Sequence, residues 1–510
     1  MLFTSFEFLL YFLPLCLCGY YLIAAGGWQR AAAAWLALMS LVFYGWWSPA
    51  YTVLLLASIG LNYGSGLLIA RALRGAGRPQ ARRLLVLAVS ANLAALAYFK
   101  YADFFIGSID RAFGMEVGLL HVVLPLGISF FTFTQIAFLV DTYVGKVSEA
   151  RFVHYLLFVT YFPHLIAGPV LHHAEMMPQF ENKATYRFQL GNFLAGAVLL
   201  LIGLAKKILL ADGIQPFVAP VFDHGLLLGG VEAWGGVLAY ALQLYFDFSG
   251  YSDMAIGLAW MFNVNLPLNF DSPYKAVNII DFWRRWHMTL SRFLRDYLYI
   301  ALGGNRHGFL RRYVNLFATM VLGGLWHGAG WTFVVWGALH GSYLIINHAW
   351  QALCRRLSLP SLGRPGHALS VLLTFACVCV AWVFFRAHDL EAALTVVSAM
   401  AGSHGWALPA EWREPLTQAW PSLAALFDFR GTAAFGGLRQ CAWVGALLAL
   451  AWFAPNSQQL MARWRAWPAT RHAAASGQAW VSVGAVSAVI LLLAILNNSL
   501  GVSEFIYFNF

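Results

Sequence analysis

Apolar residues along this chain gather into stretches about as long as a membrane-crossing helix, which needs about 20 mostly apolar residues. Stretches of this kind lie near 7–25, 31–47, 51–70, 84–105, 119–140, 190–210, 236–262, 313–330, 331–350, 367–386, 440–455 and 479–497. The pattern predicts an all-α, polytopic integral membrane protein with about 11–12 transmembrane helices. The first stretch lacks the basic start and small-residue cleavage site of a signal peptide, so we expect it to be a retained span.

One more apolar segment is interrupted by residues that disfavour a regular helix. Residues 152–171, FVHYLLFVTYFPHLIAGPVL, contain Pro163, Gly168 and Pro169. Irregular backbone at membrane depth is tolerated only where it is buried in protein or lines a cavity. We therefore expect a broken, re-entrant element here.

Composition supports the membrane assignment. Hydrophobic residues make up 60% of the 510 positions and charged residues only 11%, whereas soluble domains carry about 25% charged residues. A soluble enzyme and a disordered chain are both excluded. The sequence has no internal repeat and no long linker, so we predict a single domain over 1–510.

The net charge of +10 is best explained by topology, because short cytoplasmic loops collect lysine and arginine. Basic residues concentrate in 71–83, 275–312, 355–364 and 463–471. Placing these four clusters in the cytoplasm makes 387–440 an extracytoplasmic loop and turns both termini outward. Lys206 and Lys207 do not fit this rule, since they fall at the predicted outer end of a span. No compact basic module remains that would bind nucleic acid.

Residues 322–341, LGGLWHGAGWTFVVWGALHG, place two histidines deep in the bilayer. His327 lies roughly 20 Å below the basic residues that precede its helix, and His340 falls near mid-bilayer on the return helix. Ionisable groups at this depth are costly and usually functional, and imidazole is suited to proton transfer near neutral pH. We expect both to face one cavity in an active-site hairpin over 313–350, where the flanking glycines would admit a substrate or a second backbone.

Two other interpretations of the histidines remain open. They could be neutral side chains hydrogen-bonded to backbone carbonyls between helices. They could also bind a metal ion, but no carboxylate or third ligand lies nearby in the sequence, so no metal site is predicted. The six cysteines include no C-x-x-C pair and are expected to be packed, inert thiols.

The segment 269–312 is predicted to lie at the cytoplasmic membrane surface. Aromatic residues alternate with arginines at helical spacing over 282–299, which is typical of an interfacial helix with rings in the acyl boundary and guanidinium groups on lipid headgroups. Anchoring alone would explain the pattern. A phosphate-bearing donor such as coenzyme A or phosphopantetheine would explain it too, with donor-binding candidates Arg284, Arg285, His287 and Arg295.

Two carboxylates, Asp247 and Asp253, lie inside or at the end of the apolar stretch 236–262. They could orient a histidine, pair with an arginine, or cap a helix broken at Ser249–Gly250. Ser249 does not stand in a G-x-S-x-G turn, so a serine nucleophile is not expected.

Several ordered motifs resemble those of the membrane-bound O-acyltransferase (MBOAT) family. They are YFPHLIAGPV (161–170), QLYFDFSGYSDMAIGL (243–258), DFWRRWHMTLS with LRDYLYI (281–300), LGGNR (302–306), GGLWHG (323–328), VFFRA (383–387) and the terminal FIYFNF. The bacterial branch that O-acetylates exopolysaccharides such as alginate is the most similar.

The resemblance implies a ring of transmembrane helices, with re-entrant and interfacial helices, around a central cavity. It implies that His327 is the catalytic residue, with His340, Trp326, Asp247 and Asp253 supporting the cavity. It also implies an O-acetyltransferase of the bacterial inner membrane with no bound cofactor. Acetyl-CoA or another acyl thioester would be the donor substrate, and the partners would be a periplasmic acetyltransferase and the polysaccharide secretion machinery.

Our hypothesis is therefore acetyl transfer across the membrane to a secreted, alginate-like polysaccharide, with His327 as general base. One alternative is transfer of D-alanine or another acyl group to a cell-surface polymer. Two other classes of function stay open: a transporter, which would use broken helices and midplane histidines for a substrate path, and a non-catalytic scaffold for polysaccharide export.

Overall fold

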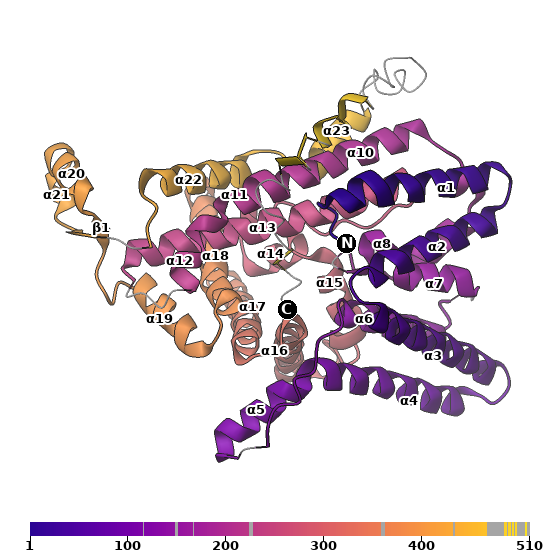
Figure 1. Cartoon of the computed structure of the whole chain (residues 1–510). Coiled ribbons are helices and arrows are strands. Elements are labelled where there is room, and N and C mark those ends of the chain that lie inside the picture. Colours follow the sequence, from indigo (N-terminus) through magenta and orange to yellow (C-terminus); the bar gives the residue numbers. More distant parts are fainter. Residues whose placement is uncertain are drawn as a thin grey trace. The chain divides into compact units, whose positions relative to one another are not determined.

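The computed structural model describes residues 1–115, 117–147, 151–166, 168–223, 228–358, 363–431, 434–466, 484–486, 488–490, 492–493, 495–496 and 505–506. Helices dominate this part of the chain (Figure 1), which confirms the predicted class. A short parallel pair, β1 (Ala407–Pro409) with β2 (Asp428–Arg430), adds a little sheet inside the predicted loop 387–440. The predicted span 479–497 and the terminal FIYFNF lie largely outside the described residues.

Contacts group the chain into two compact units, and each draws on distant segments. Unit 1 comprises Met1–Ala205, Gly250–Leu268 and the described residues from Ser457 onward, and unit 2 comprises Lys206–Ser249 and Asn269–Asn456. Neither unit is one continuous stretch of sequence. The prediction of a single domain over 1–510 stays a prediction.

Unit 1 consists of helices joined mostly by short turns. They are η1 (Glu7–Phe12), α1 (Leu13–Ala25), α2 (Gln29–Gly45), α3 (Pro49–Arg74), α4 (Arg78–Leu96), η2 (Ala97–Tyr101), α5 (Ala102–Phe113), α6 (Ile128–Val144), α7 (Phe152–Thr160), α8 (Phe162–Leu165), α9 (His173–Glu181), η3 (Lys183–Tyr186), α10 (Leu190–Ala205), the second part of α13 (Gly230–Met261) and α23 (Ser457–Ala466).

Antiparallel helix pairs form much of unit 1, and Figure 1 shows α1 beside α2 and α3 beside α4. A reciprocal amide pair joins α3 to α4: Asn62 Nδ2 donates to Asn92 Oδ1 at 3.1 Å, and Asn92 Nδ2 donates to Asn62 Oδ1 at 2.7 Å. Both side chains are buried. Because an unsatisfied amide in an apolar surrounding is costly, this exchange fixes the register of the two helices.

Close helix crossing in unit 1 depends on glycine. A Cβ on Gly203 of α10 would lie 2.6 Å from the carbonyl oxygen of Gly250 in α13, and a Cβ on Gly257 would lie 2.6 Å from the carbonyl oxygen of Gly196. Small residues let helix backbones approach in this way in membrane proteins. Helix α13 runs unbroken through Ser249–Gly250, so the idea that an aspartate caps a broken helix there is wrong.

The break predicted in 152–171 is confirmed. Helix α7 ends at Thr160, Tyr161 takes a non-helical ψ of 109°, and α8 begins directly afterwards with Pro163 in its first turn. All four residues of α8 are buried. Helix α7 has nine residues and would reach only about 14 Å, so neither helix can cross a bilayer alone.

Five helices among the described residues are long and apolar enough to cross a membrane, or up to six if the bent pair Gly437–Phe453 and Ser457–Trp464 counts as one span. The five are Glu7–Ala25, Pro49–Arg74, Arg78–Phe113, Leu190–Phe217 and Gly363–Arg386. The stretch 119–140 differs from its prediction, since regular helix starts only at Ile128 and ends at Val144. The count of 11–12 spans stays a prediction.

Unit 2 contains most of the residues with predicted chemistry, whereas Asp253 lies in unit 1. The elements of unit 2 are η4 (Lys206–Ala211), α11 (Asp212–Ile214), η5 (Gln215–Phe217), α12 (Ala219–Phe222), the first part of α13, η6 (Pro273–Lys275), α14 (Ile279–Arg285), α15 (Met288–Phe293), η7 (Leu294–Tyr299), α16 (Gly308–His327), α17 (Trp331–Arg356), α18 (Gly363–Arg386), α19 (Leu390–Met400), β1, η8 (Ala410–Trp412), α20 (Arg413–Ala419), α21 (Pro421–Ala424), β2 and α22 (Gly437–Phe453).

The single interfacial helix predicted over 282–299 is wrong. Residues there form α14, α15 and η7, with a break at Trp286 and a left-handed φ of 43° at His287. Phe282, Trp286 and Phe293 are buried inside the protein, where we expected rings in the lipid boundary. The break turns the aromatic residues toward α17 and α18, which supply the apolar partners that lipid was expected to provide.

One of the two lysines that did not fit the charge rule, Lys207, is explained by tertiary contacts in unit 2. Lys207 is buried, and its Nζ lies 2.8 Å from Oδ1 of Asp212 and 2.8 Å from Oδ1 of Asp247. A buried ammonium group is tolerated when carboxylates pair with it. Lys207 is therefore an internal ion-pair partner, and it gives no information about which side of the membrane is cytoplasmic.

We predict that Lys207→Met strongly destabilises the protein, by about 3–5 kcal/mol, because Asp247 keeps a buried charge without its cation. Thermal unfolding of the detergent-purified protein measures this. The neighbouring variant Lys206→Met is the control, since its Nζ lies 3.4 Å from the Ser249 hydroxyl and its loss should cost much less. Equal unfolding midpoints for wild type and Lys207→Met would contradict the assignment.

Candidate active site

The two helices that carry the predicted histidines approach each other unusually closely. A Cβ on Gly324 of α16 would collide with the carbonyl oxygen of Phe333 in α17, and a Cβ on Gly337 would collide with the carbonyl oxygen of Met320. Of the two roles considered for the glycines, approach of a second backbone is therefore the one found here. This approach fixes the end of α16, where His327 is the last helical residue.

His327 is enclosed by aromatic rings. Its own ring centroid lies 4.9 Å from Trp326, 5.0 Å from Trp336 and 5.2 Å from Phe385. Both His327 and Trp326 are 4% exposed. An imidazole in such surroundings is shielded from water, so its protonation depends on its few direct neighbours.

His340 lies on the other side of the Trp336 ring. Its centroid is 4.7 Å from Trp336 and 5.1 Å from Trp283, and Phe282 stacks on it at 6.0 Å. The side chain is fully buried, and neither of its ring nitrogens has a hydrogen-bond partner among the residues that the structure describes. The interpretation in which His340 bonds a backbone carbonyl is therefore wrong within this part of the chain.

His287 is the residue whose position differs most from its predicted role. We proposed it as a donor-binding residue at the membrane surface, but it is fully buried, and its ring centroid lies 6.4 Å from that of His327. It also makes an edge contact with Phe248 at 4.8 Å. The structure thus brings together two imidazoles that are far apart in sequence.

The tautomer of His287 follows from its neighbour Asn269. Oδ1 of Asn269 accepts hydrogen bonds from the Thr289 hydroxyl at 2.8 Å and from the Thr289 backbone N–H at 3.4 Å, and it lies 3.0 Å from His287 Nδ1. Because a backbone N–H can only donate, this amide atom is an oxygen, and His287 must carry its proton on Nδ1. The Nε2 atom, which has no partner among the described residues, is left as a proton acceptor.

The two predicted supporting carboxylates have other partners. Asp247 is fully buried and binds Lys207. The cation that pairs with it is therefore a lysine, whereas the sequence suggested an arginine. Asp253 belongs to unit 1, where its Oδ1 accepts a hydrogen bond from Gln458 Nε2 at 2.9 Å. Among the described residues, no three histidine, cysteine or acidic side chains gather closely enough to hold a metal ion.

The candidate donor-binding arginines differ in how far they are engaged. Arg285 Nε lies 2.9 Å from Asp281 Oδ1, and Arg295 Nε lies 2.7 Å from Asp296 Oδ1. The hydrogen bond from Arg295 to Asp296 raises the pKa of the Arg295 guanidinium. Arg284 is exposed and makes no ion pair with a described residue, so it is the one of the three whose guanidinium is most available to a ligand.

Sequence reasoning missed the pairing of His287 with His327. The available signal was the W-H pair at the end of the apolar-basic run 282–287, since a histidine that follows a buried tryptophan can share its burial. Helical spacing alone predicted a continuous surface helix and hid the break that turns His287 inward.

Known proteins resemble this chain over much of its length. The sequence model of the membrane-bound O-acyltransferase family matches residues 120–386, which include α16, α17 and the three histidines. The chain is 43% identical over 436 residues to peptidoglycan O-acetyltransferase of Helicobacter pylori, covering 80% of this chain and 81% of that protein. It is 42% identical over 447 residues to the probable alginate O-acetylase AlgI of Pseudomonas putida, covering 86% and 88% respectively.

A less similar relative has a name that specifies a different acyl group. Teichoic acid D-alanyltransferase of Bacillus subtilis is 28% identical over 275 residues, covering 51% of this chain and 68% of that protein. The names of these relatives give peptidoglycan, alginate and teichoic acid as the acceptors of their acyl groups. With a family match over more than half of its length and these relatives, the chain belongs to the membrane-bound O-acyltransferase family and is a multi-pass membrane O-acyltransferase.

Proposed function

We propose that this protein transfers acetyl groups from a cytoplasmic acyl thioester, such as acetyl-CoA, across the bacterial inner membrane to O-acetylate a secreted glycan. The observation that carries the proposal is the buried imidazole pair of His327 and His287 inside the family region. Identity of 41–43% to acetyltransferases over most of the chain favours acetyl over D-alanyl transfer. The transporter and scaffold alternatives leave this similarity to acyltransferases unexplained.

His327 acts as the general base in this proposal. It takes the proton of the acceptor hydroxyl, the hydroxyl oxygen attacks the thioester carbonyl, and the C–S bond breaks to release the thiolate, which leaves as the thiol once protonated. His287 is the nearest second imidazole, and its free Nε2 lone pair could accept a proton passed on from His327. The imidazole of His327 is kept from water by the rings of Trp326, Trp336 and Phe385. Water at this site would otherwise hydrolyse the thioester.

The acceptor is a secreted polysaccharide, reached through a periplasmic acetyltransferase partner and the export machinery. Similarity to the alginate O-acetylases supports an alginate-like polymer. Peptidoglycan is a second candidate acceptor, because the identity to a peptidoglycan O-acetyltransferase is equally high. Ester-linked acetyl on each polymer, measured separately in a strain that carries or lacks this protein, distinguishes the two.

We expect His327→Ala to abolish ester-linked acetyl on the glycan while polymer export continues, because general-base catalysis typically contributes about 10²–10⁴-fold. Released acetate after mild alkaline treatment measures the ester. The matched control is His388→Ala, which removes an exposed histidine outside the family region. Equal amounts of each protein in the membrane must be confirmed by immunoblot. Wild-type acetyl levels in His327→Ala would overturn the proposal.

For His287 we predict that replacement by phenylalanine lowers acetyl transfer by about tenfold or more, since this removes the Nε2 acceptor but keeps a ring against Phe248. Turnover by the purified protein with acetyl-CoA and an oligosaccharide acceptor provides the measurement, taken over a range of pH. Thr289→Val serves as control, because it removes a second donor to Asn269 without altering the imidazole. If the two variants lose activity equally and keep the wild-type pH profile, His287 has only a packing role.

A further inference from the structure

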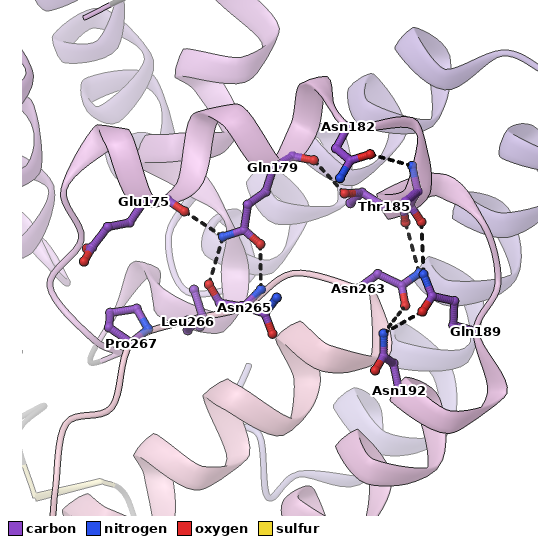
Figure 2. A pocket seen from close by; sticks show the side chains of 11 residues that line it. Glu175, Gln179, Asn182, Thr185, Gln189, Asn192, Asn263, Asn265, Leu266 and Pro267 are labelled. Atoms are coloured by element: carbon purple, nitrogen blue, oxygen red, sulfur yellow. Dashed lines mark hydrogen bonds between the residues drawn. The ribbon is translucent and has the colours of Figure 1, made fainter. Parts of the chain in front are cut away.

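A polar cavity of about 630 Å³ in unit 1 takes no part in the chemistry described above. Its walls come from α9, η3, the start of α10 and the segment that follows α13 (Figure 2). Small-molecule sites usually have volumes of about 300–1,000 Å³, so the cavity is large enough for a ligand. Amide side chains predominate in the polar part of the lining, which has no lysine or arginine among the described residues.

Hydrogen bonds between side chains and backbone fix the walls of this cavity. Gln179 Nε2 donates to the Asn265 carbonyl at 2.9 Å, and Gln179 Oε1 accepts from the Asn265 N–H at 2.8 Å. Asn263 Nδ2 donates to the Thr185 carbonyl at 3.1 Å, and Asn263 Oδ1 accepts from Asn192 Nδ2 at 3.0 Å. Figure 2 shows these two groups of bonds at separate points of the lining. A ligand would therefore meet walls that are already in position, which lowers the entropic cost of binding.

Amide groups that the walls do not use remain available to a ligand. The Asn265 side chain makes no hydrogen bond with a described residue, because only its backbone bonds to Gln179. Asn182 uses its Oδ1, which accepts from the Ala184 N–H at 3.0 Å, and its Nδ2 bonds no residue that the structure describes. Amide groups both donate and accept hydrogen bonds, as hydroxyl groups do. The cavity is therefore suited to an uncharged part of a ligand that carries hydroxyls.

The cavity lies at the ends of two helices that are long and apolar enough to cross a membrane. The lining residue Asn192 belongs to the first turn of Leu190–Phe217. Near the end of Glu7–Ala25, the Tyr21 hydroxyl accepts a hydrogen bond from the lining residue Asn263 at 3.2 Å. The ends of membrane-crossing helices lie at the level of the lipid headgroups, where tyrosine is enriched. The cavity is therefore at headgroup depth.

Cationic and apolar side chains border the cavity. Lys183 and Arg187 are exposed and stand between lining residues in the sequence, so they supply positive charge at the rim. Phe188 is 47% exposed and Leu268 is 40% exposed, and each is adjacent in sequence to a lining residue. A matching ligand combines a hydroxyl-bearing part without charge, a phosphate for the cations and an apolar part. A phospholipid whose headgroup is a polyol has all three.

We propose that this cavity binds the headgroup of phosphatidylglycerol from the surrounding membrane. The glycerol hydroxyls bond the free amides, the phosphate pairs with Lys183 and Arg187, and the acyl chains lie against Phe188 and Leu268. The charge rule predicts that this is the cytoplasmic side, since the turn after α1 and the basic loop 71–83 are two predicted spans apart. Anionic lipids are present in the cytoplasmic leaflet. The bound lipid joins α9, the start of α10 and the segment after α13 within unit 1.

Native mass spectrometry of the full chain, purified in detergent and stripped of lipid, measures the affinity for the first lipid bound. Phosphatidylglycerol and phosphatidylethanolamine with the same acyl chains are the probes. We expect the wild type to bind phosphatidylglycerol at least about tenfold more tightly, a difference of about 1.4 kcal/mol, because ethanolamine carries a positive charge and no hydroxyl. Asn265→Trp fills the cavity without removing a side-chain hydrogen bond, so it should abolish this preference.

The matched control is Gln80→Trp, which places the same ring at an exposed position near the start of α4. This variant should keep the full preference for phosphatidylglycerol, and thermal unfolding confirms that both variants fold. A wild type that binds the two lipids equally, or an unchanged preference in Asn265→Trp, would overturn the proposal.

Glycerophosphoglycerol, which has the headgroup but no acyl chains, distinguishes a lipid from a soluble phosphodiester. It should bind at least about tenfold more weakly than the lipid, since it covers neither Phe188 nor Leu268. Equal affinity would contradict the assignment to a lipid. These measurements involve no acyl transfer, so His327→Ala should bind phosphatidylglycerol as tightly as the wild type, and a failure of the lipid proposal leaves the proposed function unaffected.

Discussion

The site depends on one steric constraint, the contact of the α16 and α17 backbones at Gly324 and Gly337. Each glycine occupies a place where even a methyl group would meet a carbonyl oxygen of the other helix. Because no side chain separates the two helices there, the end of α16 is held rigidly, and His327 takes a defined position against Trp336 of α17. A larger residue at either glycine would move the imidazole by the width of a side chain, and catalytic geometry tolerates much less than that.

The second constraint is polar and acts through the break between α14 and α15. The amide oxygen of Asn269 accepts hydrogen bonds from Thr289 and His287. These bonds offset the cost of burying the polar groups. The left-handed backbone at His287 is unfavourable for a residue with a Cβ. Strain of this kind persists only where surrounding contacts impose it and is concentrated at functional sites. Here it turns a histidine from the chain surface toward His327.

Buried charges, like buried polar groups, need partners inside the protein. Lys207 binds Asp212 and Asp247 within unit 2, and this contact explains one of the two lysines that disagree with the predicted topology. The family region ends at Arg386, and the segment that follows contains α19, the β1–β2 pair and the α20–α21 helices.

The sequence by itself determined the membrane class, most helix positions and the family, because apolar length, charge and the order of motifs can be read along the chain without knowing which segments are in contact. It predicted the break near Pro163 for the same reason, since proline restricts its own backbone. It could not show that Lys207 meets Asp247, that Asp253 bonds Gln458, or that His287 leaves the surface to join His327. Those outcomes depend on which segments pack together, and only the tertiary structure decides that, because a buried polar group is stable only where a distant partner satisfies it.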